Sequence, residues 1–190
     1  IAFQTAYLKA HYPSEFMAAC LSADMDDTDK VHIFVEDSLA NGLKILSPDI
    51  NLSDYRFVPV DQKTIRFGLG AVKGTGESAI SSIIAVREQT GAFIDLFDFC
   101  HRVDRRIANR RVMESLIRAG AFDTINPNRA SLMASVGLAI EAAEQRSEAV
   151  SQAALFAESN DQSHLHLQLI PTEAWSDREK LHQEKIGLGY

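Results

Sequence analysis

The apolar residues of this sequence recur at the spacing of short amphipathic helices, and glycine or proline repeatedly interrupts the pattern. The stretches with this pattern are residues 1–12, 13–21, 28–41, 77–88, 94–102, 110–119, 128–146 and 177–186. None contains an unbroken apolar run near the ~20 residues that a membrane span requires, and no basic segment followed by an apolar one marks a signal peptide. We therefore expect a mainly α-helical fold without a membrane partner.

Residues at the ends of these stretches favour helix boundaries. Pro13 suits the first position of a helix, Asn109 and Asn126-Pro127 suit N-termini, and Gly120 suits a C-terminal stop. The acidic residues 24–29 offer a further N-cap, and we interpret them as a solvated cap because their spacing matches no calcium loop. The side chains expected inside are Phe16, Met17, Cys20, Leu21, Val31, Phe34, Val35, Leu39, Ile80, Ile83, Ile84, Leu96, Phe97, Phe99, Val112, Met113, Leu116, Ile117, Leu132, Met133, Val136 and Ile140.

The hydrophobic period changes between residues 43 and 68. Residues 43–46 suggest a short extended element, and residues 55–60 alternate between polar and apolar. A polar turn and a second extended stretch at 64–68 follow, which together predict a small β-hairpin. Pro59 lacks an N–H donor and is expected on an outer edge. The predicted fold class is thus mainly α with a small β-hairpin, in one or two domains.

The net charge of −7 argues against a nucleic-acid partner, but the charge is unevenly spread. Residues 62–130 hold 11 Lys and Arg against 7 Asp and Glu, a net of +4, whereas the rest of the chain carries −11. A basic region within an acidic chain indicates a local face for polyanions. An excess of this size also arises by chance, so the charge alone leaves both interpretations open.

Residues 69–80 place two glycines between an apolar turn and the start of a helix. Gly74 and Gly76 leave room for a phosphate to approach backbone N–H groups at the positive end of that helix, and Lys73 adds a charge beside them. The stretch resembles a helix-hairpin-helix motif, which binds the DNA backbone without reading bases. It departs from the usual pattern in having Ile80 where a small residue is common. The alternative is a purely structural turn between two helices.

A cluster of arginines precedes the helix expected at 110–119. Its members are Arg102, Arg105, Arg106, Arg110 and Arg111. Guanidinium groups suit phosphate oxygens, so the cluster suggests a second, degenerate hairpin. The alternative is a solvated basic face that Asp104 and Glu114 balance.

A short pattern follows the long helical stretch. Gln152, Leu155 and Phe156 form the sequence Q-x-x-L-F, which resembles the bacterial peptide that binds the sliding clamp. Burial of each large apolar side chain in a partner pocket contributes roughly 1.5–3 kcal/mol before ordering costs. The alternative is a helix end that packs on its own domain.

No set of catalytic residues is evident in the sequence. The two cysteines, Cys20 and Cys100, lie far apart, which fits a reducing compartment. The six histidines form no metal-binding spacing with carboxylates or cysteines. Ser, His and Asp residues are scattered rather than arranged as a triad.

Four longer blocks, residues 7–19, 44–51, 66–77 and 109–123, strongly resemble the alpha subunit of bacterial replicative DNA polymerase III (DnaE type) and occur in the family's order. The resemblance extends over essentially the whole chain and is weakest at 158–175. We therefore interpret the chain as an internal piece of such a protein.

The resemblance implies that residues 1–52 end the fingers domain and that 53–157 form a tandem helix-hairpin-helix, clamp-binding domain. Residues 158–190 would be a linker and the start of the segment leading to an oligonucleotide-binding fold. Full-length members synthesise DNA by two-metal nucleotidyl transfer at a palm that precedes Ile1. Mg²⁺ is therefore expected there and no cofactor here, apart from a K⁺ or Na⁺ ion that such hairpins sometimes hold near Gly74.

The implied partners are primer-template duplex, the sliding clamp and other replicase subunits, in the bacterial cytoplasm at replication forks. The residues predicted to bind DNA are Lys73, Gly74, Thr75, Gly76, Arg105, Arg106, Arg110 and Arg111, and those predicted to bind the clamp are Gln152, Leu155 and Phe156. A rival hypothesis is the helix-hairpin-helix module of a DNA repair enzyme or nuclease, which needs a catalytic cluster near residues 69–125. A third is a helical scaffold without DNA contact.

Overall fold

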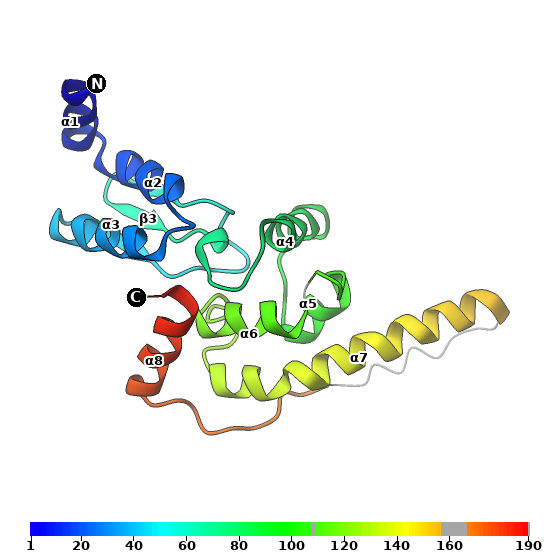
Figure 1. Ribbon diagram of the computed structural model, residues 1–190. Helices are drawn as coiled ribbons and strands as arrows, with labels where there is room; N and C mark the ends of the chain where they lie inside the picture. Colours follow the sequence, from blue (N-terminus) through cyan, green and yellow to red (C-terminus); the bar gives the residue numbers. More distant parts are fainter. Residues whose placement is uncertain (108, 157–166, 190) are drawn as a thin grey trace.

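The computed structural model describes residues 1–107, 109–156 and 167–189, and of residues 150–156 it describes the backbone alone. The chain is mainly helical, with a small three-stranded sheet beside α2 and α3, as Figure 1 shows, so the predicted fold class is confirmed. None of the helices within these ranges combines the length and hydropathy of a membrane span.

Three helices open the chain: α1 (Ala2–His11), α2 (Pro13–Ala23) and α3 (Thr28–Ala40). Pro13 begins α2, and the Asp27 carboxylate caps α3 by accepting a hydrogen bond from the Lys30 amide, both as predicted. The expectation for Leu39 was wrong, because this side chain is 55% exposed. The buried stripe of α3 runs instead through Ser38, whose hydroxyl is satisfied by the Phe34 carbonyl.

The sheet contains β1 (Lys44–Leu46), β2 (Val58–Asp61) and β3 (Thr64–Arg66) in the order β1-β3-β2. β2 and β3 form the predicted antiparallel hairpin, with Pro59 on the edge strand β2. The short element predicted at 43–46 becomes β1, which pairs in parallel with β3. That pairing was not predicted, because a three-residue strand carries no signal for its partner.

A single 3-10 turn, η1 (Leu69–Ala71), leads into α4 (Glu77–Thr90), α5 (Leu96–Arg102) and α6 (Arg110–Arg118). The apolar faces predicted for these helices are buried or half-buried. The Phe99 ring on α5 packs edge-on against Phe93 and Phe122 at centroid distances of 5.0 and 5.2 Å. These contacts join α5 to the segments that follow α4 and α6.

The longest helix, α7 (Arg129–Phe156), was expected to end near residue 146, but its backbone remains helical to Phe156. The Asn128 side chain accepts from the Ser131 amide at its start, so the cap lies two residues later than predicted. Its first part packs on α5 and α6, and its last turns project beyond the rest of the chain (Figure 1).

The chain returns along α7 as an extended segment, residues 167–176, and ends in α8 (Asp177–Leu188). Two serines of α7 hold this segment: Ser135 Oγ accepts from the Ile170 amide at 2.8 Å and Ser131 Oγ from the Thr172 amide at 3.1 Å. α8 then packs against α6. The helix predicted at 177–186 is therefore present, and it is closely packed on α6.

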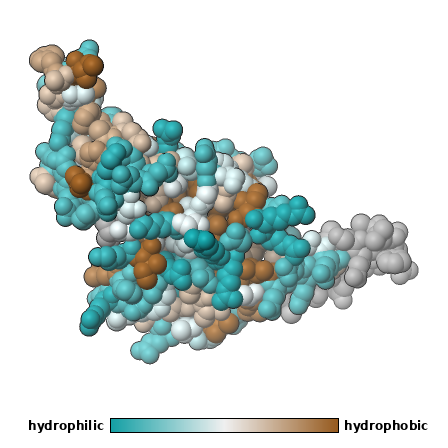
Figure 2. All heavy atoms as spheres, in the orientation of Figure 1, coloured by the Kyte–Doolittle hydropathy of each residue, from teal (hydrophilic) through white to brown (hydrophobic). Residues whose placement is uncertain are grey.

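One continuous apolar core extends from Met17 of α2 to Ala139 of α7. Around the predicted domain boundary at residues 52 and 53, Asn51 exchanges two hydrogen bonds with the backbone of Phe93, and the Ile50 amide donates to Ala121 O at 2.8 Å. Apolar side chains remain outside at several places, among them the N-terminal tip, where Figure 2 shows them on α1; Ile1 is 98% and Phe3 is 81% exposed. The boundary itself stays a prediction.

Candidate nucleic-acid interface

The glycine-containing stretch forms a tight turn, residues 72–76, between η1 and α4, which we call the first hairpin. Gly74 has φ of +82°, a left-handed conformation that favours glycine. Thr75 is buried and closes the turn, because its hydroxyl donates to Val72 O at 2.7 Å and lies 3.4 Å from Leu69 O. The K⁺ or Na⁺ ion expected near Gly74 stays a prediction.

The start of α4 has free hydrogen-bond donors. Gly76 is the N-cap and has no side chain to cap the helix, and within the described ranges no acceptor is found for the amides of Gly76, Glu77 and Ser78. A methyl group placed on Gly76 would have no atom within 4 Å, so the approach is open. Helices with free N-terminal amides attract anions. The helix start therefore provides a place for a phosphate group.

A second element brings a cation to the first hairpin. Arg111 lies in the first turn of α6, and a methyl group on Gly74 would lie 3.5 Å from its Nε and 3.0 Å from Ser115 Oγ. Arg111 is exposed, and no ion pair is found for it among the described residues. Its guanidinium therefore adjoins the turn and remains available to an anion.

Lys73 occupies a different position. Its amide donates to Gly187 O of α8 at 2.8 Å. A methyl group on Gly189, the C-cap of α8, would lie 2.3 Å from Lys73 Cε and 2.6 Å from Nζ. The lysine tip thus rests against the C-terminal end of α8.

The predicted second hairpin connects α5 to α6 through residues 103–109, and we keep the name second hairpin for it. Its helix start is capped, because the Asn109 side chain accepts from the Val112 amide at 3.1 Å. Arg105 pairs with Glu144 at 2.7 Å and Arg110 with Glu114 at 2.8 Å. The backbone amide of Arg106 donates to Asp104 at 2.8 Å. Of the predicted arginines, Arg111 is the one that the structure places at the first hairpin.

Arg102 has a structural position. Its guanidinium donates to the carbonyls of Gly91 and Ala92, pairs with Asp98, and lies 4.5 Å from the centroid of the Phe93 ring. Its side chain is 15% exposed. These contacts hold the α4–α5 connection together and leave the group little access to a ligand.

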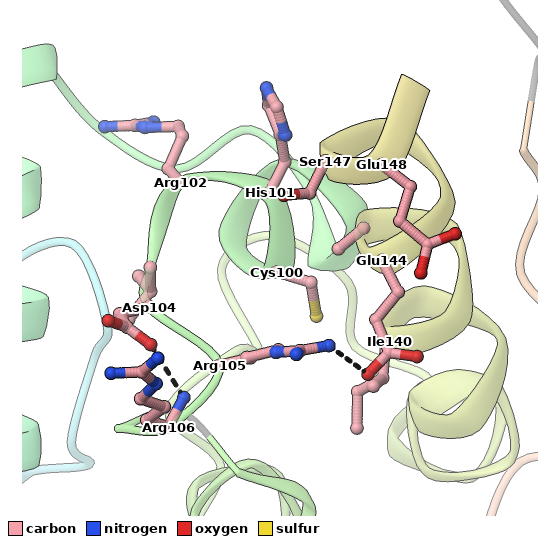
Figure 3. A pocket seen from close by; sticks show the side chains of 12 residues that line it. Cys100, His101, Arg102, Asp104, Arg105, Arg106, Ile140, Glu144, Ser147 and Glu148 are labelled. Carbon is pink, nitrogen blue, oxygen red and sulfur yellow. Dashed lines mark hydrogen bonds and ion pairs between the residues drawn. The ribbon is translucent and has the colours of Figure 1, made fainter. Parts of the chain in front are cut away.

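A groove of about 590 Å³ lies between α5, residues 103–106 and α7. Figure 3 shows Arg105 reaching across it to Glu144, with Cys100 above Arg105 in this view. Burial raises the pKa of the Cys100 thiol to about 12, so the sulfur stays protonated and unreactive at neutral pH. Burial and Arg146 lower the pKa of His101. Mixed charges and a protonated thiol give this groove no evident chemistry.

The clamp pattern falls largely outside the described structure. The backbone of Gln152, Leu155 and Phe156 belongs to the last turns of α7, but their side chains lie outside the described residues. Their role stays a prediction. Elsewhere in the described ranges, no group of three or more His, Cys, Asp or Glu side chains could hold a metal ion.

Sequence reasoning missed Ser115, Gly187 and Gly189 as neighbours of the first hairpin. A methyl group on Gly187 would lie 2.9 Å from the Ala119 amide nitrogen, so a larger residue would separate α8 from α6. The Gly-Leu-Gly sequence that ends α8 is the signal that could have indicated this close packing.

Comparison with known proteins agrees with this geometry. Residues 42–132 match the helix-hairpin-helix motif family, and this range contains the first hairpin. The whole chain is homologous to a segment of DNA polymerase III subunit alpha, which confirms the predicted resemblance.

The similarity is high and covers this chain completely. The chain is 50% identical over 190 residues to DNA polymerase III subunit alpha of Neisseria meningitidis serogroup B, covering 100% of this chain and 16% of the relative. It is 46% identical over 196 residues to the subunit of Escherichia coli K12, covering 99% of this chain and 17% of the relative. It is 44% identical over 192 residues to the subunit of Vibrio cholerae serotype O1, covering 100% of this chain and 17% of the relative. The chain therefore spans about a sixth of the length of these curated relatives.

Proposed function

We propose that this chain is a non-catalytic part of the alpha subunit of a bacterial replicative DNA polymerase. The whole protein would carry out DNA-directed DNA synthesis in the cytoplasm, with its Mg²⁺ bound outside these 190 residues. This segment would hold the primer-template duplex and attach the enzyme to the sliding clamp and other replicase subunits, which provides processivity. The observation that best supports DNA binding is the uncapped start of α4 beside Arg111.

The binding step follows from two groups. A phosphate would accept hydrogen bonds from the free amides of Gly76, Glu77 and Ser78, where the helix dipole favours negative charge. The Arg111 guanidinium would add a charge-assisted contact from α6. Both groups recognise the sugar-phosphate backbone and neither reads a base, so binding would be independent of sequence.

The test is duplex binding by the complete 190-residue chain. Two fluorescent duplexes of unrelated sequence are titrated at several KCl concentrations, and the dissociation constant is read by anisotropy. We expect equal affinities for the two duplexes. In a plot of the logarithm of the association constant against the logarithm of the salt concentration, we expect the affinity to fall as salt rises, because phosphate contacts release counterions. Failure to bind at low salt would contradict the proposal.

Attachment to the clamp rests on the Q-x-x-L-F pattern and on its place at the end of α7. A helix of 28 residues is about 42 Å long at about 1.5 Å per residue. Its last turns extend beyond the packed part of the chain (Figure 1). This location suits a peptide that must reach a separate protein while the first hairpin remains on DNA.

The clamp proposal is tested with the double substitution Leu155→Ala and Phe156→Ala in the complete chain. We expect affinity for a purified sliding clamp, measured by calorimetry, to fall at least tenfold, or about 1.4 kcal/mol. Leu181→Ala is the matched control, because Leu181 is 66% exposed on α8 and lies outside the pattern. Unchanged affinity in the double variant would refute the assignment.

The rival proposal, a helix-hairpin-helix module of a repair enzyme or nuclease, predicts turnover by the chain itself. Incubation with nicked and damaged duplexes in Mg²⁺ separates the two proposals. We expect no new DNA product. Cleavage or joining that persists when Arg111 is replaced, but is lost when a nearby carboxylate is replaced, would favour the rival.

A further inference from the structure

The Lys73 amide donates to Gly187 O in the last turn of α8, and its exposed side chain passes beside Gly189 at the end of the same helix. The backbone bond to Gly187 O and the close approach of Cε and Nζ to Gly189 involve residues two positions apart at the same helix end. The last carbonyls of a helix carry partial negative charge and favour a cation. The ammonium group therefore already lies in a favourable environment within the protein.

α8 is itself fixed to the rest of the domain. Glu184 pairs with Arg129 at 2.8 Å, and this arginine is 3% exposed and also forms two hydrogen bonds with Asp123, at 2.6 and 2.7 Å. Gln183 Oε1 accepts from Arg118 Nε at 3.1 Å. Displacement of α8 would break a buried ion pair, which is strongly unfavourable. α8 therefore offers a rigid support.

Gly189 suits this position because a side chain there would have to displace the Thr28 methyl group and the Lys73 side chain. Its φ is +94°, and a methyl group there would lie 2.2 Å from Thr28 Cγ2 as well as against Lys73. The end of α8 thus lies between α3 and the first hairpin. A methyl group at this position would press on the Lys73 side chain, which follows directly from the turn.

We propose that Lys73 is a positioning residue of the first hairpin and does not bind phosphate. α8 holds Lys73 from the protein side and thereby sets the orientation of Gly74 and Gly76, while Arg111 supplies the cation that contacts DNA. This inference rests on the proposed duplex binding and assigns different tasks to two basic residues that sequence reasoning placed together.

The first test compares Lys73→Met with Arg111→Met in the complete chain. Methionine keeps the unbranched apolar stem and removes the charge. A residue that neutralises a phosphate contributes about one unit to the log–log slope of affinity against salt. We expect Arg111→Met to lower the slope by about one unit and Lys73→Met to leave it unchanged. An equal loss of slope in both variants would overturn the inference.

The second test compares Gly189→Ala with Gly42→Ala. Both glycines have positive φ, but a methyl group on Gly42 meets no atom within 4 Å, so this control reproduces the backbone strain without the collision. We expect duplex affinity to fall at least fivefold in Gly189→Ala and to stay unchanged in Gly42→Ala, with thermal unfolding recorded for both. Equal affinities in the two variants would overturn the role of α8.

The outcomes separate this inference from the proposed function. Salt-dependent binding by the wild type with equal slopes for Lys73→Met and Arg111→Met would remove the inference and leave the function intact. Absence of duplex binding by the wild type would remove the proposed function, and the positioning role with it.

Discussion

The two hairpins have complementary features: the first has free backbone amides but few positive charges, and the second has positive charges but a capped helix start. The first hairpin has unoccupied amides at the start of α4, but Glu77 adds a negative charge there. The second hairpin has arginines and no acidic residue in the first turn of α6, but Asn109 caps that turn and glutamates pair with Arg105 and Arg110. A cluster of basic residues is therefore a weaker sign of a phosphate site than an uncapped helix start.

The difference also shows how the two hairpins can cooperate. Arg111 belongs to the helix of the second hairpin, yet it lies beside Gly74 of the first. The packing of α6 thus places the positive charge of Arg111 beside the first hairpin, which has the free amides. We expect one composite phosphate site rather than two equivalent ones.

The largest expected effect concerns Arg102, near the second hairpin. Replacement by methionine removes its hydrogen bonds to Gly91 and Ala92 and its pair with Asp98, which should lower the free energy of unfolding by about 2 kcal/mol. Duplex affinity should not change, since this group is committed to the fold. Urea unfolding and anisotropy measure the two quantities. A loss of affinity without a loss of stability would make Arg102 a DNA contact after all.

The next effect concerns the turn of the first hairpin. Gly74→Val places a branched side chain at positive φ and against Ser115, so duplex affinity should fall about tenfold, or about 1.4 kcal/mol. Gly91→Val is the control, because Gly91 has φ of +87° and open space around it. Similar affinities for the two variants would show that the turn geometry does not matter for binding.

A smaller effect is expected at the capped helix start. Asn109→Ala removes the side-chain acceptor for the Val112 amide and should lower the free energy of unfolding by about 1 kcal/mol. Duplex affinity should stay within twofold of the wild type, because in our proposal the first hairpin makes the main contact. A large loss of affinity at unchanged stability would place DNA at the second hairpin.

The smallest effect concerns the carboxylate at the open start. Glu77 is exposed and would repel a phosphate, so Glu77→Gln should raise duplex affinity about twofold at low salt. Glu88→Gln, near the far end of α4, is the control and should have no effect. An effect of the same size in both variants would indicate general charge rather than a local phosphate site.

Local residue chemistry predicted the first hairpin, the Asn109 cap and the buried faces of α4 and α6, because these depend on neighbours in sequence. The pairing of Arg105 with Glu144 could not be predicted, since it depends on how α7 packs beside α5. The support of Lys73 by α8 joins residues far apart in sequence. Positions of basic side chains depend on tertiary packing, whereas glycine turns are encoded locally.

The hydrogen bonds from Ile170 and Thr172 to Ser135 and Ser131 have a mechanical consequence. They fasten the returning chain to the base of α7, on the side nearer α8. If the tip of α7 is attached to a ring that moves along DNA, a pull on that tip acts first on these two serines and on the base of the helix. The hydrogen bonds at Ser131 and Ser135 would then carry part of the pull into the packed base of α7, and less of it would reach α8. The first hairpin, which packs on α8 through Lys73, would keep its shape under tension.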